Sequence, residues 1–395
     1  MFKKNLFFYK ISSQIVIPTW NWIFIIIITK NFGLDETGTF LLLLSYVNFS
    51  WIFTNYNSDN YISIKSSLLK KKFNNIFRHI IFLSFLLSLL IYVVIVIIFS
   101  IFAPKLNINF LILSLNIFFG VYYLFENYFI GLEKPKYFFY RKFFLYFISI
   151  CLLIFYNINL NITQLYIWYT ITNLILYFFL IYYLFKEKFR IRIKFCKLFY
   201  LKTFPIFLSS IFNFFKIRGS ILILSFYLNS YFLGIHGIII KVIDLINTST
   251  VIILKGFYNK MIFLFKNKNF KSFKFKYIVF LFVTLILVNT YKIFLVKFDA
   301  LYKINIFKLN DFIPIILFIF LMNIFYLFEN IFNLYFQTKN QNKIILLIIL
   351  ISSSIHLITL QIFTYYSNYH GSLLAMILSS FLTFLLNVYY LKYYK

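Results

Sequence analysis

The stretch IIFLSFLLSLLIYVVIVIIFSIF, residues 80–102, decides the fold class of this chain. It contains no charged side chain, and a helix that rises about 1.5 Å per residue over this length crosses the roughly 30 Å hydrocarbon core of a bilayer. Charged residues bound it on both sides, with the Lys70–Lys72 run and Arg78 before it and Lys105 after it. The stretch is therefore predicted to be a transmembrane helix.

The composition extends this prediction to the whole chain. Of 395 residues, 62% are hydrophobic, 24% are aromatic and only 12% are charged, whereas soluble domains carry about 25% charged residues. Apolar runs between the charge clusters predict about twelve spans, and we expect an all-α polytopic membrane protein. The spans lie near residues 11–29, 40–60, 80–102, 109–131, 137–156, 163–185, 205–226, 234–254, 277–296, 312–335, 342–363 and 371–391.

The distribution of positive charge predicts the orientation of the chain. There are 39 Lys and Arg residues against 10 Asp and Glu, a net charge of +29. When basic residues near the end of a span are counted with the adjoining loop, 30 of them, Lys142 included, fall on the side of the N-terminus and six on the opposite side. The other three, Lys216, Arg218 and Lys241, lie within spans. Basic residues accumulate in cytoplasmic loops, so both termini are expected in the cytoplasm.

The positions of the basic clusters also indicate their partner. They alternate with apolar spans, which favours contact with anionic lipid and argues against nucleic acid. The two longest connections, near 186–204 and 255–276, are short and basic. We expect both to be amphipathic segments on the cytoplasmic leaflet.

A five-residue segment occurs twice in the chain. Tyr123–Asn127, with the sequence YLFEN, recurs 203 residues later as Tyr326–Asn330. The copies fall in the fourth and the tenth span, six spans apart, so both helices should run in the same direction. This predicts two six-helix halves, residues 1–200 and 201–395, arranged as parallel repeats.

The sequence lacks the motifs of nucleotide hydrolysis and of the common catalytic sites. Gly33 and Gly38 have the spacing of a phosphate-binding loop, but Thr39-Phe40 follows where Lys-Ser/Thr is needed. The four histidines show no metal-ligand spacing, and no serine or cysteine has a nucleophile signature. We therefore expect no catalytic residue, no metal and no cofactor.

Basic residues inside the spans are candidates for binding an anionic substrate, because intramembrane charge is costly and usually faces a bundle interior or a wet cavity. Lys216 and Arg218 lie about 200° apart around a helix. At least one should line a central lumen, unless both pair with acids or carbonyls. Lys241 is a third candidate for this cationic lumen, although Lys241 and Asp244 are three residues apart and can pair with each other.

Acidic residues in the spans are candidates for ion coupling or gating. Glu126 and Glu329, the two glutamates of the repeated segment, lie about four to six residues from the cytoplasmic ends of their expected helices. They could bind a coupling ion, gate the inner mouth or lock helices together by hydrogen bonds. Asp244 and Asp59, the latter expected at the inner end of the second span, complete this group.

Four short motifs follow one another along the span map. They are Lys30–Phe40, with a Gly-x-x-x-x-Gly loop after the first span; Gly131–Lys134 after the fourth; Pro205 and Leu228–Gly237 at the start of the second half; and Gly371–Ala375 in the last span. Their order resembles that of the polysaccharide flippase (Wzx) family, within the multidrug/oligosaccharidyl-lipid/polysaccharide (MOP) exporter superfamily.

The resemblance implies a MATE-like fold and a function in surface polysaccharide synthesis, as for O-antigen. Members of this family flip undecaprenyl-diphosphate-linked oligosaccharide units to the outer leaflet of the bacterial cytoplasmic membrane, by alternating access coupled to H⁺ or Na⁺. Lys216 and Arg218 would then meet the diphosphate or acidic sugars, and the polymerase and chain-length regulator of the pathway are candidate partners. Members often carry an acid in the middle of the seventh span, where this chain has Lys216-Ile217-Arg218, so the coupling residue stays open.

Two other functions are open at this point. A polysaccharide polymerase or membrane glycosyltransferase would be an enzyme with a large outer loop bearing arginines or acids, which the span map lacks. Another exporter of the superfamily would carry drugs, for which an acidic lumen is favoured, or the peptidoglycan-precursor lipid, whose flippase is typically longer. The expected class is a transporter and not an enzyme.

Overall fold

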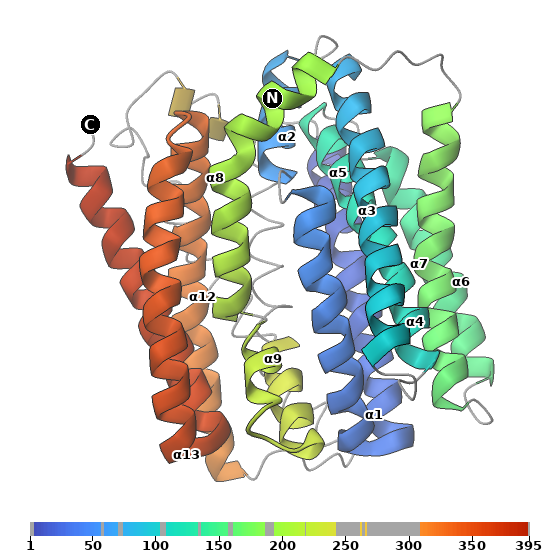
Figure 1. Ribbon diagram of the computed structural model, residues 1–395, viewed down its shortest axis with the longest axis vertical. Helices are drawn as coiled ribbons and strands as arrows, with labels where there is room; N and C mark the ends of the chain where they lie inside the picture. Colours follow the sequence, from blue (N-terminus) through green and yellow to red (C-terminus); the bar gives the residue numbers. More distant parts are fainter. Residues whose placement is uncertain are drawn as a thin grey trace.

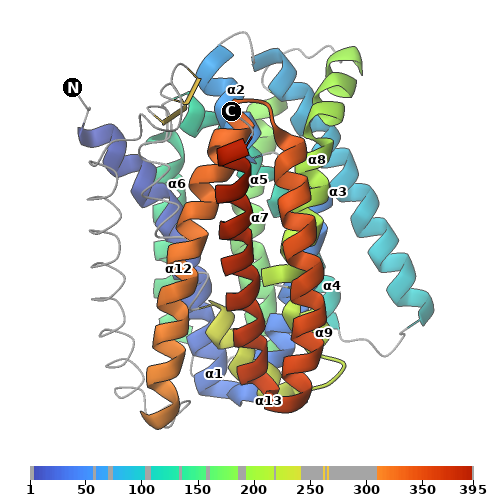
Figure 2. The same cartoon turned by 90° about the vertical axis from the view of Figure 1, so that its left-hand side faces the viewer.

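The computed structural model consists of long helices that run side by side along one axis (Figures 1 and 2). All regular elements in the described part of the chain are helical. The structure describes residues 4–56, 59–69, 74–102, 108–132, 136–156, 161–185, 193–217, 219–241, 261–262, 265–266 and 309–393.

The labelled helices have the following bounds. They are α1 (Lys4–Asn55), α2 (Asp59–Leu69), α3 (Asn74–Phe102), α4 (Ile108–Ser114), the 3₁₀ turn η2 (Leu115–Phe118), α5 (Phe119–Gly131), α6 (Lys136–Tyr156), α7 (Ile162–Phe185), α8 (Ile193–Ile217), α9 (Ser220–Leu224), α12 (Leu309–Thr338) and α13 (Asn342–Tyr393). A further helix covers residues 230–241.

Five described stretches are long and apolar enough to cross a membrane, which makes the chain an integral membrane protein. They are Thr19–Asn55, Ile76–Ile97, Asn109–Gly131, Asn342–Ser367 and His370–Tyr393. α4, η2 and α5 together form the single span predicted at 109–131, and α6, α7 and α12 also lie at predicted positions. The predicted span at 277–296 and most of that at 234–254 lie outside the described residues, so the twelve-span layout in two halves stays a prediction.

Two of the helices turn back on themselves and each cover two predicted spans. α1 reverses at Gly33, whose φ of 86° and ψ of −176° are not helical. Only glycine adopts such a conformation readily, because it has no Cβ. α13 descends and returns in the same way, so Lys4, where α1 begins, and Tyr393, where α13 ends, lie at the same end of the molecule (Figures 1 and 2).

Two predicted boundaries are wrong. α8 begins at Ile193, within the segment expected to lie on the membrane surface, and carries Pro205 in its interior instead of at its start. It also ends at Ile217, earlier than the predicted 226. The second predicted span ends at Asn55, and Asp59 opens the separate short helix α2. Apolar runs mark a length of chain but do not show where a helix extends into polar flanks or breaks inside the bilayer.

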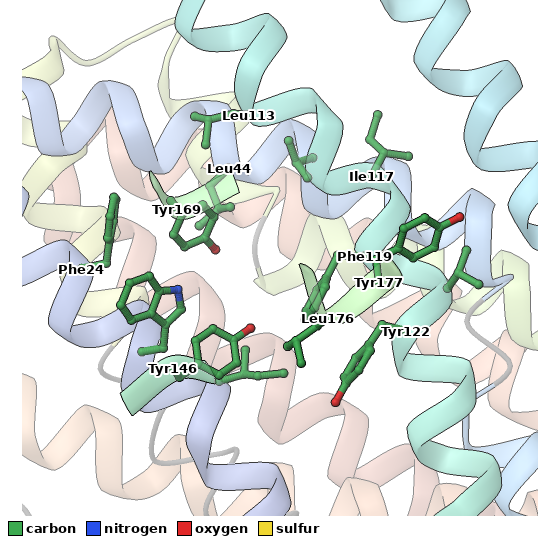
Figure 3. Packing of buried hydrophobic residues seen from close by; sticks show 14 of the residues in the cluster. Phe24, Leu44, Leu113, Ile117, Phe119, Tyr122, Tyr146, Tyr169, Leu176 and Tyr177 are labelled. Atoms are coloured by element: carbon green, nitrogen blue, oxygen red, sulfur yellow. The ribbon is translucent and has the colours of Figure 1, made fainter. Parts of the chain in front are cut away.

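The largest buried core lies among the helices before residue 200, where α1 packs on α6 and α5 packs on α2 and α7. Aromatic rings dominate it: Trp20 lies 5.5 Å from Tyr146 between ring centroids, and Phe24 lies 4.9 Å from Tyr169 (Figure 3). A second core joins α12 and α13, and α8 packs along α13. Figure 1 shows α8 between the early helices and α12–α13.

Candidate functional site

Both glutamates of the repeated YLFEN segment form ion pairs with buried lysines of another helix. Glu126 on α5 pairs with Lys142 on α6, at 2.6 Å between Oε2 and Nζ. Glu329 on α12 pairs with Lys216 on α8, at 3.2 Å. All four side chains are at most 5% exposed. The repeat therefore presents one acid in each copy, and each acid meets a positive charge inside the helix bundle.

The asparagines that follow these glutamates behave alike in the two copies. The Nδ2 of Asn127 donates to the Tyr123 carbonyl at 2.8 Å, and the Nδ2 of Asn330 donates to the Tyr326 carbonyl at the same distance. The lysines, in contrast, come from unlike places. Lys142 lies on the helix that follows its glutamate, whereas Lys216 lies on a helix that precedes its glutamate by more than a hundred residues. The local backbone is thus the same in both copies, and the pairing differs.

Lys142 is a site residue that the sequence analysis missed. It was counted among the cytoplasmic charges, yet it is fully buried on α6, and its Nζ lies 5.0 Å from the centroid of the Tyr122 ring. A signal was present, because Lys142 falls inside the span predicted at 137–156. A positive charge at that depth needs a partner, and Glu126 supplies it.

Neutral side chains of α6, α7 and η2 form a buried hydrogen-bond network. Asn173 on α7 accepts from the Tyr146 hydroxyl at 2.9 Å and donates to Asn116 at 2.8 Å. Asn116 in turn donates to Thr170 at 3.0 Å. Because buried polar groups are costly unless they are hydrogen-bonded, this network fixes α6, α7 and η2 relative to one another.

Lys216 is held at the point where α8 breaks. Besides Glu329, its Nζ donates to the Thr383 hydroxyl on α13 at 2.9 Å. The chain leaves α8 at Ile217, and the Gly219 amide donates back to the Phe214 carbonyl at 2.7 Å before α9 begins. Discontinuous helices inside a bilayer expose backbone dipoles and are common at transport sites. A lysine at the carboxyl end of a helix is also favoured by the helix dipole.

Two histidines extend this second site without carrying an ion pair. The Nδ1 of His356 lies 3.4 Å from the Ser379 hydroxyl, one turn before Thr383 on α13. His236 lies between the Ser220 and Ser372 hydroxyls, at 3.3 Å and 3.0 Å. Both rings are fully buried. His236 connects α13 with α9 and the helix at 230–241, whereas His356 links the two arms of α13.

The remaining candidates are placed only in part. Lys241 is half-buried at the end of the helix at 230–241. Arg218 and Asp244 lie outside the described residues, so the expected pair of Lys241 and Asp244 and the position of the Arg218 guanidinium stay predictions. Asp59 is placed only by its backbone, at the start of α2. In the described residues no group of His, Cys, Asp and Glu could hold a metal ion.

At the end of the molecule opposite α2, the backbones of α1 and of the helix at 230–241 approach each other closely (Figure 1). A Cβ at Gly38 on α1 would collide with the Ser230 carbonyl oxygen, and one at Gly234 would collide with the Leu34 carbonyl oxygen. Only glycine permits this backbone approach. These two helices are therefore in direct backbone contact, next to the reversal at Gly33.

The fold has close counterparts among solved structures. The structure of MATE in the straight conformation superposes with a TM-score of 0.69 at 12% identity and covers 98% of this chain and 95% of that one. The MATE multidrug transporter DinF-BH, solved as a complex, gives 0.72 at 13%, covering 99% and 94%. The chain has the MATE fold. A MOP superfamily transporter from Pyrococcus furiosus, described by the reverse polarity of its binding pocket, gives 0.59 at 12%, covering 98% and 94%.

The MATE fold agrees with the MATE-like architecture that the sequence predicts. At these identities the likeness reaches no further than the fold, and the expected Wzx-type specificity stays a prediction. No protein-family model matches the sequence, and no curated protein sequence matches it significantly. Two of the structures that share the fold are described as multidrug transporters, and transport by this chain stays a prediction.

Proposed function

We propose that this protein flips undecaprenyl-diphosphate-linked oligosaccharide units across the bacterial cytoplasmic membrane by ion-coupled alternating access. One observation carries the proposal: inside a MATE fold, the buried acids Glu126 and Glu329 are each neutralised by a buried lysine. An interior of this kind does not attract cations. It suits a substrate that carries its own negative charge on a diphosphate.

Lys216 is the group that would meet the diphosphate, together with Arg218 and Lys241. It is shared between Glu329 and Thr383, so a phosphate oxygen would compete with the carboxylate for the same ammonium. The Glu329 carboxylate would then be an unpaired charge in a low-dielectric site, and a bound cation would strongly stabilise it. Substrate binding and uptake of H⁺ or Na⁺ at Glu329 would thereby be coupled.

The pair formed by Lys142 and Glu126 has a different role in this scheme. Lys142 and Glu126 lie 2.6 Å apart, and the fully buried Tyr122 ring covers the ammonium. This pair would hold α5 and α6 together, or act as a second coupling site if Glu126 is released. Asp244 and Asp59 remain further candidates for coupling and gating.

Drug export is the second candidate, because the MATE multidrug transporter DinF-BH shares the fold. A cationic drug needs an acid that is not already neutralised. Within the described residues, each buried glutamate has a lysine beside it. A MOP superfamily transporter described by a binding pocket of reverse polarity has the same fold, so the fold is compatible with an interior of the opposite charge.

The proposal is tested by deleting this chain in its bacterial host and analysing undecaprenyl-linked sugars and surface glycan by chromatography. A complete repeat unit that accumulates on the inner leaflet, with loss of surface glycan, is the expected result. Units that reach the outer surface without lengthening would show a polymerase instead. Arg218→Ala should lower surface glycan at unchanged protein level, whereas Lys392→Gln, on the exposed end of α13, should leave it unchanged.

A further inference from the structure

The helix α2 lies at one end of the molecule (Figure 1) and carries one of three lysines, from separate elements, whose charges act on one another. Lys65 is on α2, Lys202 is near the start of α8, and Lys266 is in the short helical segment 265–266. Lys65 is half-buried, whereas Lys202 and Lys266 are exposed. One belongs to the first expected half of the chain, and two belong to the second.

The packing beneath these lysines fixes their positions. Ile64 and Phe265 are buried in one hydrophobic cluster, which also contains Ile345 of α13. The Nδ2 of Asn342, at the start of α13, donates to the Lys202 carbonyl at 3.1 Å. The backbone beside each lysine is therefore tied to the same part of the structure, and the three side chains are close enough for the charges of Lys202 and Lys266 to act on Lys65.

Among the residues that the structure describes, no acidic side chain pairs with this lysine cluster. The Nζ of Lys65 lies over the Tyr61 ring, 5.1 Å from its centroid. Burial lowers the pKa of Lys65, and the charges of Lys202 and Lys266 lower it further. In the described part of the chain, no acid lies within ion-pair distance of the three. Such a cluster is destabilised by its own repulsion and is stabilised by a bound polyanion.

We propose that Lys65, Lys202 and Lys266 form a docking site for the diphosphate head group of the substrate at the inner face of the membrane. The inference rests on the proposed function, because it takes its ligand from it. A diphosphate carries several negative oxygens, which three ammonium groups from three elements can engage together. The site is separate from Lys216 and would precede it on the path of the substrate.

The helix α2 connects this docking site with the two ion pairs. The Ser63 hydroxyl donates to the Asn127 carbonyl at 2.8 Å, in the first copy of the repeated segment. Ile64 packs in the same cluster as Leu327, in the second copy. A head group that draws Lys65 toward Lys202 and Lys266 would therefore act on both glutamate-bearing helices.

The test uses the purified full-length protein in nanodiscs of phosphatidylcholine, titrated with inorganic pyrophosphate by calorimetry. The triple variant Lys65→Gln, Lys202→Gln, Lys266→Gln should bind at least about tenfold more weakly, because each lysine near an anion contributes several-fold. The control Lys392→Gln removes one exposed positive charge elsewhere and should bind as the unchanged protein does. If the triple variant does not stay folded, Lys202→Gln and Lys266→Gln are measured singly, and each should weaken binding several-fold.

The proposal is wrong if the triple variant binds pyrophosphate as tightly as the unchanged protein does. It is also wrong if the Lys392→Gln control loses as much affinity as the triple variant. Nanodiscs of phosphatidylglycerol distinguish a second source of phosphate. If the unchanged protein binds pyrophosphate in phosphatidylcholine but not in phosphatidylglycerol, the lipid head groups occupy the cluster. The cluster would then recognise phospholipid in general, and the diphosphate assignment would be wrong. If pyrophosphate binds as expected while deletion of the chain leaves undecaprenyl-linked sugars unchanged, the proposed function is wrong and the site stands.

Discussion

Removing the ammonium of Lys216 is the most direct perturbation of the second ion pair. In Lys216→Met the Glu329 carboxylate, 5% exposed, loses the charge that neutralises it. Breaking a buried pair by removing one partner costs about 3–5 kcal/mol of folding free energy. Glu329→Gln should cost less, about 1–3 kcal/mol, because the ammonium keeps the Thr383 hydroxyl as an acceptor at 2.9 Å.

The double variant Lys216→Met, Glu329→Gln contains no buried charge at this place. Its loss of stability should therefore be smaller than the sum of the two single losses by at least about 1 kcal/mol. The assay is reversible unfolding in mixed micelles with increasing dodecyl sulfate, followed by circular dichroism. Lys392→Met, an exposed change on α13, is the control and should stay within about 0.5 kcal/mol. Losses that add within about 0.5 kcal/mol would refute an interaction between the two side chains.

Three further predictions address other parts of the structure. Lys142→Met should lower the unfolding free energy by about 3–5 kcal/mol in the same assay, and an unchanged value would mean that Glu126 is neutralised by another group. Gly38→Val should reduce both transport and stability, because its side chain would collide with the Ser230 carbonyl; transport equal to that of the unchanged protein would show that this contact is not needed. Pyrophosphate binding should weaken as pH rises, and the weakening should begin below pH 10.5, the ordinary pKa of lysine. The reason is that the pKa of Lys65 is lowered, so its ammonium loses its proton at a lower pH than a free lysine does. Weakening that begins only above pH 10.5 would contradict the role of Lys65.

The lowered pKa of Lys65 also makes the folding stability depend on pH. The folded state disfavours the charged form of Lys65, so the unfolded chain binds more protons in the pH range just below 10.5. The stability of the protein should therefore rise slightly with pH in that range as this one group titrates. Binding of pyrophosphate reverses the shift, since a nearby anion favours the ammonium form.

The spans and the repeated segment could be predicted from the sequence because their causes are local. A run of apolar side chains must be helical in lipid, whatever surrounds it, and residues 109–131 form a span at the predicted residues although α4, η2 and α5 divide it. The repeated segment likewise predicted one acid inside each of two spans, Glu126 and Glu329, and the structure shows both of them buried. Hydropathy missed the break of α8 at Ile217 and the separate helix α2, because both depend on which neighbouring helices satisfy the backbone there.

What the tertiary structure alone decided is the partner of each charge. Lys142 and Lys216 occupy unrelated positions in the sequence, yet each meets the same residue of the repeated segment. The proximity of Lys65, Lys202 and Lys266 has the same origin, since an apolar cluster and the hydrogen bond from Asn342 to the Lys202 carbonyl hold their elements together. Whether a stretch of chain enters a bilayer follows from how apolar its own side chains are, which the sequence gives directly. The pairing of charges across helices follows from packing geometry, which no single stretch of sequence contains.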